Sequence, residues 1–173
     1  MMLSSSIKSI TTRTELRPGD LGRITSMHAD LYTREYHFGL QFETYFGRGL
    51  CEFFEHYDPA RSRIWVCEHE KRMVGSLVLM DRGELAQLRY FLIAPEYRGI
   101  GLGKKLMNLF MDFLLQSGYH GAYLWTTHEL DTAASLYKRF GFKLIEEKEL
   151  TTFGKYLIEQ RYDLVLPNNL MAK

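Results

Sequence analysis

The stretch FLIAPEYRGIGLGK, residues 91–104, places three glycines at alternate positions between a run typical of a strand and the start of an amphipathic helix. Glycine lets the backbone approach a ligand closely and adopt positive φ. A helix start offers unpaired N–H groups and the positive end of the helix dipole, which together favour an anion. Arg98 and Lys104 add positive charge suited to a pyrophosphate. The stretch therefore predicts a cradle for a nucleotide diphosphate.

Two better-known phosphate loops do not fit this stretch. A Rossmann fingerprint has the spacing G-x-G-x-x-G in an early strand-turn-helix unit, whereas the spacing here is G-x-G-x-G in mid-chain. A P-loop has G-x-x-x-x-G-K-[ST], but Arg98 stands at its first glycine and Lys105 at its Ser/Thr position. A glycine-rich helix entry without a ligand is the remaining alternative.

Outward from this stretch, the periodicity of apolar residues predicts the flanking elements. Upstream, Asp20 is expected as a helix N-cap, and Gly47 and Gly49 predict a break in a second helix that ends at Asp58-Pro59. The expected strands upstream are a short one within 11–17, a hairpin of 63–69 with 72–80, and 85–94. The downstream elements are a helix from 102 to Ser117-Gly118, a strand at 122–126, a helix at 131–140, and strands at 142–150 and 156–166.

This order predicts an α/β fold of the mixed α+β kind, with a mixed sheet flanked by helices and one right-handed β-α-β crossover. At 173 residues and 46% apolar, we expect a single domain over residues 11–166, with tails at 1–10 and 167–173. The 22 basic against 21 acidic residues argue against a nucleic-acid partner, and no apolar run reaches the ~18 residues of a membrane span. Cys51 and Cys67 are too few for a disulfide framework, so we expect a cytoplasmic protein.

The motifs themselves resemble a known family. RGIGLG, residues 98–103, matches the R/Q-x-x-G-x-G/A acetyl-CoA signature of the GNAT superfamily of N-acetyltransferases. ASLYKRFGF, residues 134–142, is similar to that superfamily's segment ending in L-Y-x-x-x-G-F. The fragments LRPGDLG (16–22), LYTREY (31–36) and FGKYLIEQ (153–160) resemble the acetyltransferase domain found fused to MarR-type regulators.

The resemblance implies a mostly antiparallel sheet that is splayed between the strand expected at 85–94 and the strand expected at 122–126. The acyl-CoA arm would lie in this opening. It implies acetyl-CoA as the acyl donor and direct transfer to an amine, with no acyl-enzyme. The residues implied to contact the donor are Phe91, Leu92, Ile93, Arg98, Gly99, Ile100, Gly101, Leu102, Gly103, Lys104, Thr127 and Tyr137. Thr127 stands where such acetyltransferases often carry asparagine.

The reaction needs a neutral amine and a proton for the departing thiolate. Tyr137 stands where the superfamily usually places its general acid, and a phenol stays protonated at neutral pH. For the general base, Glu84 is the acidic candidate at the strand expected at 85–94, which also carries Gln87 and Arg89. Glu35, in the first helix, is the alternative candidate for the base. A buried packing tyrosine and two solvated surface carboxylates are the alternative interpretations.

The acceptor pocket is predicted from one helical face. Residues at spacings of three and four combine aromatic rings with a carboxylate, which suits a cationic amine. They are His28, Tyr32, Glu35 and Tyr36, with Trp125 expected beside the cleft. His28 and Trp125 could equally be core residues. No histidine spacing indicates a metal, so none is predicted.

The most concrete hypothesis is therefore an acetyl-CoA-dependent N-acetyltransferase acting on a primary amine of a small molecule or amino acid. The alternatives are acetylation of a protein N-terminus or lysine, and an acyl-CoA-binding module without catalysis. Because superfamily members are often dimers, the resemblance also leaves room for a homodimer.

Overall fold

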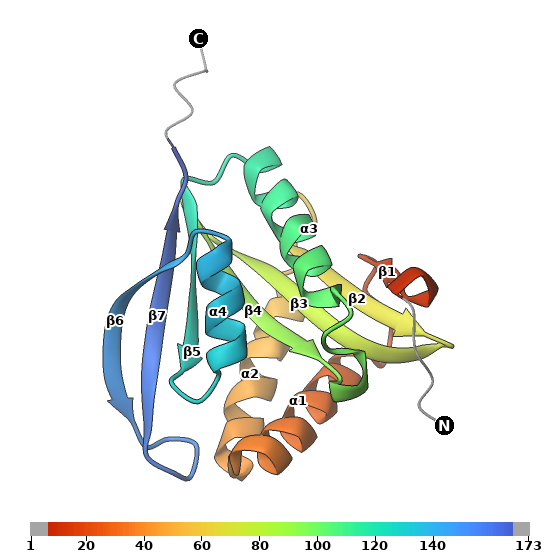
Figure 1. The fold of residues 1–173 in the computed structure, drawn as a ribbon. Coiled ribbons are helices and arrows are strands. Elements are labelled where there is room, and N and C mark those ends of the chain that lie inside the picture. The colour runs from red at the N-terminus through yellow and green to blue at the C-terminus, as the bar shows by residue number, and fades with distance from the viewer. Residues whose placement is uncertain (1–6, 168–173) are drawn as a thin grey trace.

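The computed structural model describes residues 7–167, and its elements follow the predicted order (Figure 1). The helical elements are η1 (Ile7–Ser9), α1 (Asp20–Tyr36), α2 (Leu40–Glu55), η2 (Pro95–Tyr97), α3 (Leu102–Gln116) and α4 (Asp131–Arg139). The strands are β1 (Thr11–Arg13), β2 (Arg63–His69), β3 (Arg72–Arg82), β4 (Leu85–Ile93), β5 (Gly121–Thr127), β6 (Lys143–Leu150) and β7 (Leu157–Val165).

The seven strands form one sheet in the order β1-β2-β3-β4-β5-β7-β6. Neighbouring strands are antiparallel except β4 and β5, which are parallel and joined through α3. A parallel pair needs such a crossover, whereas the β2–β3 hairpin needs only the two residues Glu70 and Lys71, both at positive φ. The mixed, mostly antiparallel sheet confirms the predicted fold class.

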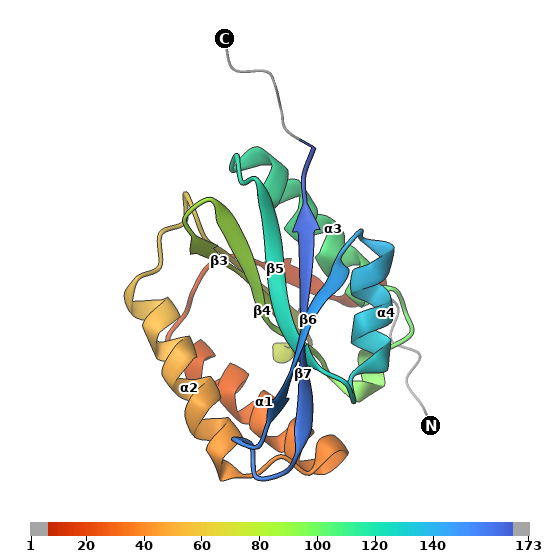
Figure 2. The ribbon, with the colours of Figure 1, turned by 90° about the vertical axis from the view of Figure 1, so that its left-hand side faces the viewer.

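Alternating side chains of the sheet feed two separate cores. Trp65, Leu77 and Leu79 join the core under α3 and α4, while the intervening Ile64 and Val78 join the core under α1 and α2. Figure 2 shows α1 and α2 on one side of the sheet and α3 and α4 on the other. The central strands β3 and β4 are therefore covered on both faces, whereas the edge strand β6 is exposed.

Two local predictions were wrong. Helix α2 is continuous through Gly47 and Gly49. Gly49 lets it pack closely on β4, since a Cβ there would lie 2.8 Å from the Tyr90 hydroxyl, whereas a Cβ at Gly47 would meet only Thr25, at 3.7 Å. The N-cap of α1 is Gly19, not Asp20. The buried Asp20 carboxylate instead pairs with Arg13 of β1 at 2.7 Å and accepts from the Arg17 amide at 2.8 Å, which ties β1 to α1.

The predicted division into a domain at 11–166 and two tails stays a prediction. Residues 1–6 and 168–173 lie outside the described residues. Within the predicted N-terminal tail, residues 7–9 form η1 and Ile10 is buried. Across residues 7–167, no helix has the length and apolar character that a membrane span requires.

Candidate active site

The loop between β4 and α3 forms an open cradle of backbone amides. Gly99 and Gly101 have φ of 76° and 92°, conformations that side-chain-bearing residues rarely adopt. Gly101 is the N-cap of α3, and no side chain caps the helix, so its first amides are left for a ligand. A Cβ at Gly99 would meet no described atom within 4 Å, so the loop faces open space. This cradle fits the diphosphate of an acyl-CoA.

The residues of the glycine motif, 98–104, have different roles. Gly103 faces α4, where a Cβ would lie 3.3 Å from Leu136, so this glycine lets α3 and α4 approach each other. Leu102 is buried in the core, Ile100 is partly buried against it, and Lys104 is exposed. The backbone, Arg98 and Lys104 are thus the parts of this motif that a ligand can reach.

Beside the cradle, the parallel strands β4 and β5 separate. They pair over Leu85–Gln87 with Gly121–Tyr123 and then diverge, while β5 stays paired to β7 over its whole length. The amide of Ala94 donates to Val74 on β3, so alternation directs the backbone groups of Phe91 and Ile93 toward the opening. Leu92 faces β3, opposite Ser76. The opening therefore exposes a strand edge that no strand within residues 7–167 pairs with, although the Ile93 carbonyl accepts from the Arg98 Nε at 3.1 Å. An amide-bearing arm can extend the sheet along this edge.

A bulge in β4 changes the direction of the side chains at this point. The register shifts so that Leu77 of β3 faces both Tyr90 and Phe91, and Tyr90 has φ of 52°. The Ser76 hydroxyl donates to the Tyr90 carbonyl at 2.8 Å and holds the bulge. As a result Tyr90 joins the core under α1 and α2, while the Phe91 ring lies 6.2 Å from that of Tyr137 on α4.

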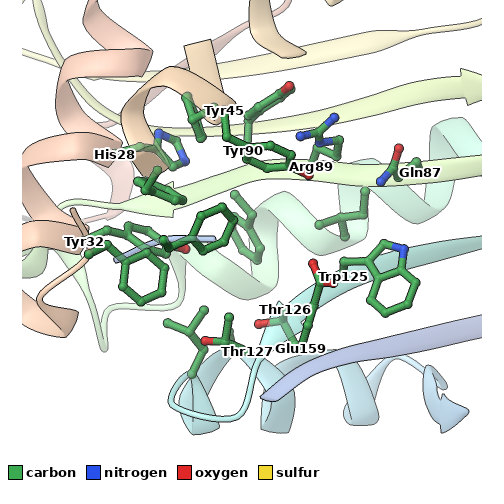
Figure 3. A pocket seen from close by; sticks show the side chains of 18 of the residues that line it. His28, Tyr32, Tyr45, Gln87, Arg89, Tyr90, Trp125, Thr126, Thr127 and Glu159 are labelled. Atoms are coloured by element: carbon green, nitrogen blue, oxygen red, sulfur yellow. The ribbon is translucent and has the colours of Figure 1, made fainter. Parts of the chain in front are cut away.

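A cavity of about 150 Å³ lies at the mouth of this opening (Figure 3). Its wall is mostly aromatic, with rings from both helical layers and from the strands. The lining residues are His28, Tyr32, Phe38, Phe42, Tyr45, Phe46, Gln87, Leu88, Arg89, Tyr90, Phe91, Trp125, Thr126, Thr127, Leu130, Ala133, Tyr137, Phe153 and Glu159. Five residues predicted to contact the acceptor or the donor are thus brought together with Tyr137: His28, Tyr32, Phe91, Trp125 and Thr127.

Tyr137 has the surroundings of a proton donor. It lines the cavity, its side chain is buried, and its hydroxyl makes no hydrogen bond to any residue between 7 and 167. Burial, with a contribution from Tyr32, raises the pKa of the Tyr137 hydroxyl well above its ordinary value. The hydroxyl therefore keeps its proton at neutral pH and has a hydrogen bond to offer to a ligand.

Three buried polar atoms of cavity residues lack a partner among the described residues: His28 Nε2, the Tyr90 hydroxyl and Thr127 Oγ1. Leaving such a group unpaired costs about 1–3 kcal/mol. The Nδ1 of His28 donates to the Ile24 carbonyl at 2.8 Å, so Nε2 is the acceptor in the neutral ring. Burial lowers the pKa of His28 to about 3 and raises that of Tyr90 to about 12. Three unpaired groups around one cavity indicate a polar ligand.

Two charged residues of the cavity wall were not among the predicted site residues. Glu159 of β7, opposite Thr127 in register, pairs with Lys148 at 3.1 Å. Arg89 of β4 lies over the Tyr90 ring at 4.7 Å. The alternation of residues 87 and 89 on one strand is the signal that could have identified Arg89. No signal in the sequence pairs β7 with β5.

Glu84, Glu35 and Tyr36 do not line this cavity. Glu84 is exposed in the β3–β4 turn, where its carboxylate lies 3.9 Å from His120. Glu35 pairs with Arg98 at 3.0 Å. The Tyr36 ring packs on Tyr32 at 5.4 Å, outside the lining. The catalytic roles predicted for the two carboxylates and the substrate role of Tyr36 stay predictions, without support from this geometry. Within residues 7–167, no group of three or more His, Cys, Asp or Glu is arranged to hold a metal ion.

The chain is similar in sequence to a protein named as an N-acetyltransferase. The chain is 31% identical over 101 residues to the uncharacterized N-acetyltransferase YjgM of Escherichia coli. The aligned range covers 56% of this chain and 60% of that relative. The chain thus spans less than two thirds of the relative's length.

Two solved structures share the fold. An acetyltransferase from Streptococcus agalactiae superposes with a TM-score of 0.76 at 22% identity, over 92% of this chain and 100% of that one. The spermidine N-acetyltransferase of Vibrio cholerae in complex with CoA and spermine superposes with a TM-score of 0.68 at 24% identity, over 91% of this chain and 96% of that one.

The family model decides the classification. The model described as the acetyltransferase (GNAT) family matches residues 26–142, a range that begins within α1 and includes the glycine cradle, the opening between β4 and β5, and Tyr137. The narrower resemblance to domains fused to MarR-type regulators stays a prediction. Because the match covers more than half of the chain, this protein belongs to the acetyltransferase (GNAT) family.

Proposed function

We propose that this protein is an N-acetyltransferase that moves the acetyl group of acetyl-CoA directly to a primary amine of a small molecule. One observation carries the proposal: the unpaired hydroxyl of Tyr137 lines a cavity at the point where β4 and β5 separate, beside an open cradle of helix amides. In this proposal the diphosphate binds the glycine cradle, the amide-bearing arm follows the open edge of β4, and the thioester reaches Tyr137.

The proposed chemistry balances as follows. The amine nitrogen attacks the thioester carbonyl carbon, a C–N bond forms, and the C–S bond breaks. The departing thiolate takes the proton of the Tyr137 hydroxyl. The ammonium form of the amine loses one proton to solvent before attack, and the proton that the nitrogen loses after the C–N bond forms returns through water to the Tyr137 phenolate. Tyr137 acts in this scheme as general acid, which is typically worth about 10²–10⁴ in rate.

The base is assigned by elimination among the cavity residues. His28, with a pKa lowered to about 3, holds no proton at neutral pH and serves as a hydrogen-bond acceptor for the amine. Among the described lining residues, Glu159 is the carboxylate. We infer that amine deprotonation runs through water near Glu159, rather than through the distant Glu84 or the Arg98-paired Glu35.

We propose a cytoplasmic location for this protein. Cys51 and Cys67 are both free thiols, which supports a reducing compartment such as the cytoplasm. A homodimer stays a prediction.

Thiol release from acetyl-CoA tests this function. The purified protein is mixed with acetyl-CoA and a panel of amines: polyamines, amino acids, arylalkylamines and a peptide with a free N-terminus. We expect thiol release that depends on an amine and matches the N-acetylated product found by mass spectrometry. Acetyl-CoA binding without release for any amine would favour a non-catalytic binding module, and release with the peptide alone would favour a protein acetyltransferase.

A further inference from the structure

The cavity wall carries a cation without a counter-ion. The guanidinium of Arg89 lies 4.7 Å from the centre of the Tyr90 ring and 5.8 Å from that of Tyr45, and it makes no ion pair or hydrogen bond with residues 7–167. The carboxylate of the wall, Glu159, is already neutralised by Lys148 at 3.1 Å. The cavity therefore presents one uncompensated positive charge (Figure 3).

Helix α2 leaves space for this guanidinium at Gly49. A Cβ at Gly49 would lie 3.2 Å from each Nη atom of Arg89 and 2.8 Å from the Tyr90 hydroxyl. Glycine is disfavoured inside a helix, so its presence at this position is explained by the space that Arg89 and Tyr90 need. The two tyrosine rings and the bare backbone at Gly49 thus hold the guanidinium at the cavity without using its hydrogen-bonding groups.

The rest of the wall is apolar and aromatic. The rings of His28 and Phe46 lie 4.2 Å apart, and those of Tyr32 and Phe42 stack at 4.8 Å. An acceptor that fills this space brings an apolar or aromatic group, and its charge must suit Arg89. A polyamine would place a second ammonium in a cavity whose unpaired charge is already positive. A carboxylate, in contrast, matches the planar fork of a guanidinium.

We propose that the acceptor is an amino acid with an apolar or aromatic side chain, whose carboxylate is bound by Arg89. This inference rests on the proposed acetyl transfer and names its substrate class. The amine then meets the unpaired Nε2 of His28, and the side chain packs among the aromatic rings.

Three amines that differ only at the carboxylate test the inference: L-phenylalanine, L-phenylalaninamide and phenethylamine. We expect kcat/KM for L-phenylalanine to exceed that for each of the other two by at least about tenfold. The amide has the less basic amine, so amine deprotonation alone would favour the amide. Arg89→Gln should lower kcat/KM for L-phenylalanine by about 30- to 100-fold, the lower range for truncating one partner of a charge pair. It should leave the KM for acetyl-CoA unchanged, and its effect on kcat/KM for phenethylamine, which has no carboxylate, should be at least about tenfold smaller.

Arg48→Gln is the matched control, because Arg48 is an exposed arginine of α2 that does not line the cavity. We expect this variant to keep wild-type constants, and Arg89→Lys to recover part of the loss. Equal use of all three amines, or an equal loss for all three in Arg89→Gln, would overturn the inference and leave the acetyl transfer standing.

If none of the three amines is acetylated, product binding decides. In the presence of coenzyme A, N-acetyl-L-phenylalanine should raise the Tm and N-acetylphenethylamine should not, and Arg89→Gln should abolish the difference. Equal shifts, or no shift with either compound, would overturn the inference. Failure of acetyl-CoA to bind and to release thiol with any amine of the wider panel would instead remove the proposed function itself.

Discussion

The carboxylate of Glu35 on α1 accepts three hydrogen bonds from the guanidinium of Arg98, at 3.0, 3.1 and 3.1 Å. The Arg98 Nε also donates to the carbonyl of Ile93 at 3.1 Å. The arginine expected at the diphosphate therefore links the end of β4 to helix α1. A phosphate group that recruits Arg98 has to compete with Glu35.

This competition predicts that Glu35→Gln tightens coenzyme A binding. Partly exposed ion pairs contribute about 0.2–1 kcal/mol, so the expected gain is about two- to fivefold in Kd by calorimetry. Arg98→Ala should weaken binding, and adding Glu35→Gln to it should change nothing further. Asp30→Asn, an exposed carboxylate on the same helix, is the control. A wild-type Kd for Glu35→Gln, or a gain that persists without Arg98, would show that the two residues do not compete.

The glycine cradle predicts a difference between the two ends of α3. Gly101→Val and Gly118→Val both place a side chain at positive φ, 92° and 73°, with no crowding nearer than 3.8 Å. Each should lower the free energy of unfolding by about 1–2 kcal/mol or slightly more, measured by urea denaturation. Gly101→Val alone should weaken coenzyme A binding by more than about tenfold, because a branched residue at this left-handed N-cap disturbs the amides that form the cradle. Equal coenzyme A affinity in the two variants would place the diphosphate elsewhere.

Burial of neutral His28 predicts an acid-sensitive stability. Its pKa falls from an ordinary 6.5 to about 3 in the folded state, so between these values the unfolded chain binds more protons. The contribution of His28 to the free energy of unfolding should therefore be complete above pH 6.5. Below pH 6.5 the free energy of unfolding should fall by up to about 1.4 kcal/mol per pH unit. His28→Phe should flatten this slope between pH 6.5 and 4.5, whereas His56→Phe, at an exposed position, should keep it. Parallel slopes in wild type and His28→Phe would contradict the burial of a neutral ring.

The raised pKa of Tyr137 predicts the shape of the pH–rate profile. Burial and the neighbouring Tyr32 keep the phenol protonated well beyond its ordinary pKa of 10. Single-turnover rates should therefore rise as the amine loses its proton and show no descending limb up to about pH 10. A descending limb centred below pH 9 would mean that the essential acid is a different group.

The features that the sequence predicted correctly are those set by local chemistry. Stretches rich in apolar residues and bounded by turns identified the strands, and the helix expected from residue 102 to Ser117-Gly118 required a parallel pair, which β4 and β5 form. The glycines at 99 and 101 have the left-handed backbone that their alternate spacing suggests. Tyr137 was found by its place in a family motif, and it lines the cavity.

The features that escaped prediction depend on contacts between distant residues. Helical spacing placed Glu35 beside Tyr32, but its carboxylate is turned to Arg98, which is 63 residues away in the chain. Gly49 predicted a break in a helix. Its actual role depends on Arg89, which is distant in the chain and approaches the helix where a Cβ at Gly49 would lie. Glu159 enters the wall only through the pairing of β7 with β5, which periodicity does not reveal.

The substitution Tyr137→Phe tests the central claim most directly, namely that acetyl transfer takes place at the opening between β4 and β5 with Tyr137 as proton donor. Single-turnover acetylation should be followed with an accepted amine, so that product release does not mask the chemical step. We predict a fall of about 10²–10³-fold, with unchanged coenzyme A affinity and unfolding free energy, because only one oxygen is removed. Tyr162→Phe, a buried tyrosine outside the cavity, should keep the wild-type rate. A wild-type single-turnover rate in Tyr137→Phe would contradict the account.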